Sequence, residues 1–368
     1  MSDLQKQVQV LLDELVDSGA ETGLQAAVYR RGELVVDAVA GVADVETGRP
    51  VTPDSVFYAA SALKAVGATV VHVLVEKGVL SYDTRVAQLW PEYAAHGKEA
   101  TTLRHVLTHS AGIPAIPAGT TPAQFCDAEV MAGLIADLEP WWTPGARVGY
   151  HAVTFGFVLA EVVRRATGRP ISQVLAEDVA GPLGVADEVF FGVPQAQRGR
   201  VAPLVDDPAG VAAFAALPPD LPLFRSGPRE LFPNAALANN PDVLGADIPA
   251  WGTASARGLA RVYAALLDEV DGVRLVSPER LRLITTLSTD GIDEMTGGPA
   301  QYGLGYTLGT VGMTPVAPTV FGMVGIGGSA AYADPATGVS VALTKNRFNP
   351  VEMNAYEQVR ALAVAAFR

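Results

Sequence analysis

A serine and a lysine stand three residues apart where a short apolar run meets a long helical pattern. The run is Val56–Ala60, Ser61 follows it, and Lys64 falls in the first turn of a pattern that continues to Gly78. Because residues i and i+3 share one face of a helix, we expect the two side chains to touch. A lysine among apolar neighbours loses water, which lowers its pKa and lets it accept a proton from a hydroxyl. The spacing therefore predicts a nucleophile, Ser61, beside a proton acceptor, Lys64.

A serine at a helix start also has a structural explanation, since serine is a favoured N-cap residue. That explanation covers Ser61 but not Lys64, because a cation in the first turn opposes the helix dipole. The free N–H groups of a helix start also lie close to the serine, where an oxyanion forms during acyl transfer. The combination favours nucleophilic acyl transfer over capping alone.

Four further segments follow this pair along the chain. Residues 79–86 read VLSYDTRV, 102–113 read TLRHVLTHSAGI, 142–151 read WTPGARVGYH and 322–338 read GMVGIGGSAAYADPATG. In this order they resemble the class C β-lactamase and penicillin-binding-protein type of serine hydrolase, and residues 102–113 are the most specific match. That family includes D-Ala-D-Ala carboxypeptidases, esterases and acyltransferases. The resemblance extends over roughly residues 20 to 350.

The resemblance implies a role for each matching residue. Ser61 would be the acylated nucleophile, and Lys64 its proton acceptor or electrostatic partner. Tyr150 would act as general base towards Ser61 and then as acid towards the leaving group, the alternative being a half-buried core tyrosine. The backbone N–H groups of Ser61 and Ile326 would form the oxyanion hole, because Ile326 follows Gly325, the glycine of the third motif. The resemblance implies no cofactor and no metal.

Two positions depart from the family pattern. The two residues after Tyr150 are His and Ala, where β-lactamases carry a small residue and then Asn. The third motif, usually Lys-Thr-Gly or His-x-Gly, reads Met-Val-Gly at 323–325, so it lacks the cation and the hydroxyl that favour a substrate carboxylate. We therefore expect poor recognition of β-lactams and of peptides with a free C-terminal carboxylate. The predicted substrate-binding residues are His151, Met323, Val324 and Gly325.

His151 has two possible roles, and the sequence does not choose between them. It either supplies the positive partner that Tyr150 otherwise lacks, or it packs in the core. Without a cation nearby, Tyr150 has one fewer partner to lower its pKa.

The intact residues predict acyl transfer through Ser61 on an uncharged ester or amide. An apolar floor at Met323, Val324 and Ile326 suits an uncharged acyl group. If water is the acceptor the protein is an esterase. If an amine or alcohol is the acceptor, it is an acyltransferase or transamidase of natural-product assembly, and the balance depends on whether water is excluded from the acyl-enzyme. A ligand-binding family member that has lost catalysis is the remaining alternative.

Other sites receive less support from the sequence. His105 and His109 stand four apart, as in some metal sites, but no third ligand is evident. His72 lies in an apolar helical pattern, which is typical of a core histidine. The G-x-S-x-G motif of another hydrolase class is absent, and Ser329 precedes two alanines in a strand-like run.

The composition of the 368 residues is that of a folded protein, with 49% hydrophobic and 18% charged residues. The net charge of −13 disfavours binding to nucleic acid or to an anionic membrane surface. A single cysteine, Cys126, rules out a disulfide within the chain, and no apolar run is long enough to span a membrane. The N-terminus does not read as a secretory signal, so a cytoplasmic location is expected.

Strand patterns occur at both ends of the chain, and the segment between them has patterns typical of helices and loops. They predict an α+β fold of the β-lactamase/transpeptidase type, in which one antiparallel sheet is flanked by terminal helices and joined to a mostly helical subdomain. A single domain of residues 1–368 would divide into 1–80 with 251–368, and a helical insert of 81–250. Residues 217–249, rich in Pro and Gly, are predicted to form an irregular surface loop. The expected elements are helices Leu4–Val16, Ala62–Gly78, Thr102–Leu107, Ala123–Leu138, Val153–Thr167 and Val351–Phe367, and strands Leu24–Tyr29, Glu33–Val39, Tyr302–Leu308, Thr319–Met323, Ser329–Asp334 and Val339–Thr344.

Overall fold

The computed structural model describes residues 3–367 and is built around one seven-stranded antiparallel sheet. In their order across the sheet, the strands are β3 (Arg49–Pro50), β2 (Glu33–Asp44), β1 (Gly23–Arg30), β14 (Val339–Lys345), β13 (Ala330–Asp334), β12 (Phe321–Val324) and β9 (Thr307–Leu308). The N-terminal hairpin thus lies beside the C-terminal strands, because β1 pairs with β14 along its length.

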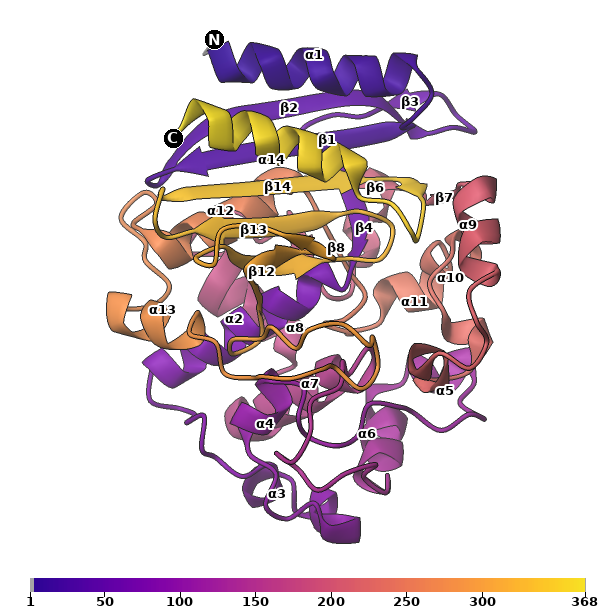
Figure 1. The fold of residues 1–368 in the computed structure, drawn as a ribbon, viewed down its shortest axis with the longest axis vertical. Helices are drawn as coiled ribbons and strands as arrows, with labels where there is room; N and C mark the ends of the chain where they lie inside the picture. The colour runs from indigo at the N-terminus through magenta and orange to yellow at the C-terminus, as the bar shows by residue number, and fades with distance from the viewer. Residues whose placement is uncertain (1–2, 368) are drawn as a thin grey trace.

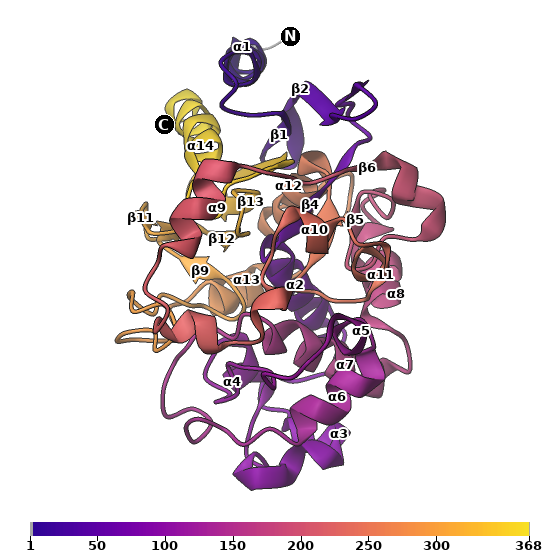
Figure 2. The ribbon, with the colours of Figure 1, turned by 90° about the vertical axis from the view of Figure 1, so that its right-hand side faces the viewer.

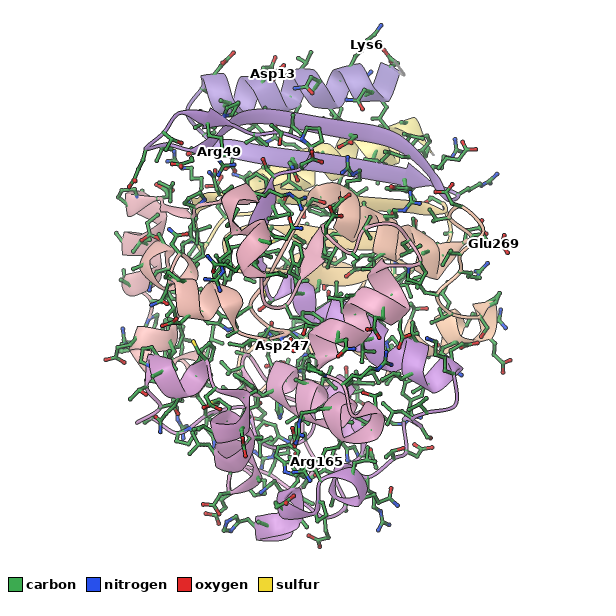
Figure 3. All side chains as sticks on the ribbon, turned by 180° about the vertical axis from the view of Figure 1, so that it is seen from behind. Lys6, Asp13, Arg49, Arg165, Asp247 and Glu269 are labelled. Carbon is green, nitrogen blue, oxygen red and sulfur yellow. The ribbon has the colours of Figure 1, made fainter. Side chains whose placement is uncertain are left out.

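Helices cover both faces of this sheet (Figure 1). α1 (Asp3–Asp17) and α14 (Asn354–Ala366) contact each other and pack on one face, while α12 (Ala256–Leu267) packs against β1, β13 and β14. Figure 3 labels Lys6 and Asp13 on the outer side of α1, where both side chains are exposed to solvent. The amphipathic pattern of the N-terminal segment therefore positions a covering helix on the sheet.

Side chains of β1 point alternately to the two faces of the sheet and so belong to two different hydrophobic cores. Val28 belongs to the cluster under α1 and α14, whereas its neighbour Tyr29 belongs to the larger core that includes α12 and α2. Successive side chains of a strand point to opposite faces, so a run that is apolar throughout must be covered on both sides.

α2 (Ala62–Glu76) runs between the sheet and the helical part of the molecule (Figure 1). It contacts β12 on one side and α7 (Thr154–Thr167) on another, and every residue from Ala62 to Leu74 is buried. A second sheet, of order β5-β8-β4-β6, leads the chain into α2. Its strands are β5 (Val189–Phe190), β8 (Gly252–Ala254), β4 (Val56–Ala60) and β6 (Val201–Ala202).

The remaining elements are short. Within residues 3–367, none of the helices has both the length and the apolar character needed to cross a bilayer. The short helices are α3 (Val86–Leu89), α4 (Leu103–Leu107), α5 (Pro122–Phe125), α6 (Ala128–Ala136), α8 (Ile171–Val174), α9 (Pro208–Ala215), α10 (Ala235–Ala238), α11 (Pro241–Gly245) and α13 (Pro278–Ile284). Several of them, including α5, α9, α10 and α11, lie on the side of the molecule that faces the viewer in Figure 2. Short segments of other helix types are η1 (Pro91–Gly97), η2 (Leu175–Ala180), η3 (Gln195–Arg200), η4 (Pro222–Arg225) and η5 (Arg229–Leu231). Two further pairs of short strands are β10 (Thr310–Val311) with β11 (Thr314–Pro315), and β7 (Val205–Asp206) with β15 (Arg347–Phe348).

The predicted α+β class is confirmed, and one predicted strand is much shorter than expected. Of residues 302–308 only Thr307–Leu308 forms a sheet strand, because Gly305 has a positive φ of 85° and its N–H donates to the carbonyl of Leu107 outside the sheet. Residues 217–249 contain four short helical turns where an irregular loop was expected. The division into 81–250 and the rest stays a prediction, and β5, β6 and β7 place short strands inside that segment.

Candidate active site

Ser61 lies at the junction where β4 turns into α2. The residue before it, Ala60, has φ +47°, a left-handed conformation that costs an alanine roughly 1–2 kcal/mol. Ser61 itself is helical, with φ −61° and ψ −15°, and its side chain makes no capping hydrogen bond to α2. The hydroxyl lies instead 2.7 Å from Nζ of Lys64. The structure therefore brings together the two residues that the spacing predicted to touch, and Ser61 occupies the N-cap position of α2 without using its side chain as a cap.

Lys64 is fully buried in the first turn of α2. No Asp or Glu of the described residues lies within 4.0 Å of its Nζ. Loss of water therefore acts unopposed and lowers the pKa of Lys64 to about 7. At neutral pH a large fraction of this amine is uncharged and can accept a proton from Ser61.

Tyr150 lies close to both residues of this pair, with the Nζ of Lys64 5.0 Å from the centre of its phenol ring. The tyrosine follows Gly149, where a side chain would come within 2.7 Å of the Trp142 ring. Burial raises the pKa of Tyr150, while its hydrogen bond with Ser61 acts in the opposite direction. Tyr150 is therefore a neutral phenol at physiological pH, within reach of the Ser61 hydroxyl.

Gly325, just after β12, lies very close to the end of β4, which leads into Ser61. A Cβ on Gly325 would lie 2.2 Å from the carbonyl oxygen of Ala59, so a larger residue would force the two segments apart. Among the hydrogen bonds of residues 3–367, neither the N–H of Ser61 nor that of Ile326 donates to a protein acceptor. Both residues line the same cavity. Two backbone N–H groups without a protein acceptor thus belong to residues that line the cavity of Ser61.

The cavity in front of Ser61 has a volume of about 450 Å³ and a mostly apolar surface. Met323 and Val324 form part of its floor, as predicted from the apolar third motif. None of the described residues that line the cavity is Asp, Glu, Lys, Arg or His. Its walls include Ile116, Phe214, Leu223, Leu231, Phe232, Trp251, Tyr302 and Met313.

Two buried basic side chains close to this region supply no positive charge to the cavity. His151 lies outside the cavity lining; its Nε2 accepts from the N–H of Ile113 at 3.1 Å, and its Nδ1 lies 2.6 Å from the carbonyl oxygen of Gly149. Burial lowers the pKa of His151 to about 4, so the ring packs as a neutral group. Of its two possible roles, the structure fits packing, and the substrate-binding position predicted for His151 is not where the ring lies.

Lys345 is the second of these side chains, and it lies within 3.2 Å of a Cβ built on Gly328, two residues after Ile326 of the cavity lining. Its Nζ forms a buried ion pair with Glu21. A cation held in this way has its charge compensated inside the protein. Lys345 therefore does not replace the cation that the third motif lacks.

His109 belongs to the site, although the sequence suggested it only as one member of a metal pair. The ring is fully buried, with its centre 4.9 Å from that of Tyr150 and 4.9 Å from that of Tyr302. Its Nδ1 accepts the N–H of His151 at 3.1 Å, and burial holds its pKa well below the usual value. No group of three His, Cys, Asp or Glu side chains in residues 3–367 is arranged to hold a metal ion. His109 is thus a neutral packing partner of Tyr150.

Other residues of the site were not predicted. The wall formed by residues 214–233 comes from a segment whose composition suggested only a surface loop, and Asp293 and Tyr302 lie in segments without a recognisable motif. The match of 102–113 to the family segment was the one signal that pointed to His109.

The chain is similar to known proteins in sequence and in fold. The family model described as Beta-lactamase matches residues 8–366. The chain is 36% identical to the esterase/beta-lactamase LipL of Mycobacterium tuberculosis over 87% of its own length and 76% of that protein. A family VIII carboxylesterase structure has a TM-score of 0.88 at 29% identity, covering 99% of this chain and 98% of the other. A penicillin-binding protein homolog from Caulobacter crescentus has a TM-score of 0.84 at 32% identity, covering 99% and 98%. The chain therefore belongs to the beta-lactamase family.

Proposed function

We propose that the protein is a serine ester hydrolase that forms an acyl-enzyme on Ser61 from small uncharged esters. The observation that carries the proposal is a cavity of about 450 Å³ without a charged side chain, opening on the Ser61–Lys64 pair. A volume of this size suits a small organic ligand, and an apolar lining without charges favours a neutral acyl group. The printed names of the relatives, an esterase/beta-lactamase and a carboxylesterase, support this chemistry.

The proposed reaction begins with the Ser61 oxygen attacking the ester carbonyl carbon while its proton passes to the neutral amine of Lys64, 2.7 Å away. The backbone N–H groups of Ser61 and Ile326 would hold the oxyanion. The C–O bond to the alcohol then breaks, the leaving oxygen takes the proton of the Tyr150 phenol, and the phenolate recovers the proton held by Lys64. Water repeats the sequence on the acyl-enzyme, which releases the acid and returns a proton to Ser61.

Assigning the first proton transfer to Lys64 follows from the two opposite pKa shifts. Burial lowers the pKa of Lys64 to about 7 and raises that of Tyr150. The amine is therefore the group with a free lone pair at neutral pH, and the phenol is the group with a proton to give. The same burial produces both states because it disfavours the charged form of each group.

A dependence on pH follows from this assignment. The proton acceptor must be neutral, and Lys64 is neutral above its pKa of about 7. We expect kcat/KM for p-nitrophenyl butyrate to rise with pH through a midpoint near 7 and to be about 100-fold lower at pH 5 than on the plateau. The measurement is a pH–rate profile, with circular dichroism at each pH to confirm that the protein stays folded. A flat profile between pH 5 and 8 would remove Lys64 as the titrating base.

Substrate charge provides a second test. p-Nitrophenyl butyrate and p-nitrophenyl hydrogen succinate have acyl chains of the same length, but the second ends in a carboxylate. Burying that carboxylate in a cavity without a cation costs several kcal/mol, so we expect kcat/KM at least about 100-fold lower for the succinate and slow hydrolysis of nitrocefin, which also bears a carboxylate. Val324→Lys, a change in the cavity floor, should narrow the difference between the two esters. Equal rates for the two esters, or fast turnover of nitrocefin, would contradict the proposal.

A further inference from the structure

Asp293 is a fully buried carboxylate next to the candidate active site, and the chemistry above does not use it. Its Oδ1 accepts hydrogen bonds from three backbone N–H groups, those of Tyr150 at 3.1 Å, Met295 at 2.9 Å and Thr296 at 2.9 Å. Its Oδ2 accepts the hydroxyl hydrogen of Tyr302 at 2.9 Å. One side chain therefore binds both the backbone of Tyr150 and the loop of residues 293–302.

The loop and the tyrosine segment are joined at further points around this carboxylate. The N–H of Glu294 donates to the carbonyl of Val148 at 2.9 Å. The N–H of Gly149 donates to the carbonyl of His109 at 3.0 Å. The backbone just before Tyr150 is thus fixed, and Asp293 supplies the bond at Tyr150 itself.

Asp293 also reaches the phenol ring of Tyr150 through packed rings. The hydroxyl of Tyr302 donates to Asp293, the Tyr302 ring centre is 4.9 Å from that of His109, and the His109 ring centre is 4.9 Å from that of Tyr150. Tyr302 and Thr296 both line the cavity, so the carboxylate connects the substrate wall to the tyrosine.

The four donors to Asp293 are all neutral. No Lys, Arg or His among the described residues lies within 4.0 Å of its carboxylate. Burying a charge without a counterion is costly unless hydrogen bonds replace the lost water, and each bond to a charged acceptor is stronger than one between neutral groups. Removing the carboxylate would therefore leave four hydrogen-bond donors without their acceptor at once.

We propose that Asp293 is a positioning residue, which fixes the Tyr150 phenol relative to Ser61 and couples it to the cavity wall through Tyr302. The inference rests on the proposed function, because Tyr150 matters only if acyl transfer occurs at Ser61. Asp293 lies behind the backbone of Tyr150 and acts through that residue, without touching the substrate.

Two substitutions separate positioning from simple structural support. In Asp293→Ala the Tyr150 N–H and the Tyr302 hydroxyl lose their acceptor, so we expect kcat for p-nitrophenyl butyrate to fall about 10- to 100-fold with KM changed less than about threefold. In Asp293→Asn one oxygen remains to accept the three N–H groups, so kcat should stay within about fivefold of wild type.

The matched control is Glu188→Ala. Glu188 is also a buried carboxylate, bound to Ser255 and Arg257, and it does not line the cavity. We expect this variant to unfold at lower temperature and to keep the wild-type kcat at a temperature where it is folded.

The outcomes distinguish the inference from the proposed function. If wild type forms no acyl-enzyme, the proposed function fails. If wild type is acylated and folded Asp293→Ala has the same kcat, the positioning role is wrong while the function stands. If Asp293→Ala does not fold, Tyr302→Phe decides, because it removes only the hydroxyl that donates to Asp293. We expect its kcat to fall about 3- to 10-fold with KM changed less than about threefold, and an unchanged kcat would overturn the inference.

Discussion

Ser61→Ala is expected to lower kcat/KM for p-nitrophenyl butyrate by about 10⁴-fold or more, because the oxygen that forms the acyl-enzyme is removed. The folded structure should be retained, since the Ser61 side chain makes no capping bond to α2. The fall should appear in kcat, measured by steady-state kinetics, while the thermal unfolding curve stays close to that of wild type.

Ser226→Ala is the matched control for this loss. Ser226 is a buried serine that lines the same cavity, and it does not contact Lys64. Its activity should stay within a few-fold of wild type. An Ser61→Ala protein that hydrolyses the ester at the wild-type rate would show that the reaction takes place elsewhere.

Lys64→Met is expected to lower the acylation rate by about 10²–10⁴-fold and, at the same time, to make the protein more stable at pH 6. The loss of rate follows from removal of the proton acceptor 2.7 Å from the Ser61 oxygen. The gain in stability follows because a fully buried lysine without an acidic partner is a cost to the folded state, whereas methionine fills a similar volume without charge.

The sign of the stability change depends on pH. The pKa of Lys64 is about 7 in the folded protein and 10.5 in the unfolded chain, so between these values the unfolded state binds the extra proton. Wild-type stability therefore gains from Lys64 as pH rises from 7 towards 10.5. The advantage of Lys64→Met, of the order of a few kcal/mol at pH 6, should shrink as pH approaches 10. Urea unfolding of both proteins at pH 6 and pH 9.5 measures it.

Lys98→Met serves as the control with the opposite sign. Lys98 is also fully buried, but its Nζ donates to the carbonyl oxygens of Ala95, Ala136 and Leu138. Methionine would leave these acceptors unpaired, so this variant should be destabilised while its acylation rate is unchanged. If Lys64→Met were destabilised to the same extent as Lys98→Met, the account of Lys64 as a desolvated, unpaired base would be wrong.

A local pattern in the sequence predicted the helix that carries the nucleophile. This helix begins after Ser61 and ends at Glu76, close to Gly78, where the helical pattern was expected to stop. Helical spacing and a terminal glycine lie within the segment itself. The Ser61–Lys64 contact follows from the same spacing because both residues belong to one helical turn. The strand formed by the apolar run Val56–Ala60 was not predicted, because an apolar run without alternation does not by itself distinguish a strand from a helix.

Contacts between segments far apart in the sequence were harder to predict from the sequence. The partners of Tyr150 come from around residue 109 and from the loop at 293–302, and no pattern in either segment signals a buried carboxylate. The wall at 214–233 has the composition of a loop, and only its packing over the Ser61 cavity reveals its aromatic side chains as a binding surface. His151 looked equally suited to catalysis and to packing, since the choice depends on whether the carbonyl of Gly149 and the N–H of Ile113 occupy its ring nitrogens.

The most direct test of the account is the intact mass of the protein, quenched in acid within its first turnovers on p-nitrophenyl butyrate and then mapped by peptide sequencing. We predict that wild type gains the mass of one butyryl group, located on Ser61, and that Ser61→Ala gains none. Turnover by a wild-type protein whose mass never changes, or a butyryl group on any residue other than Ser61, would contradict the central claim.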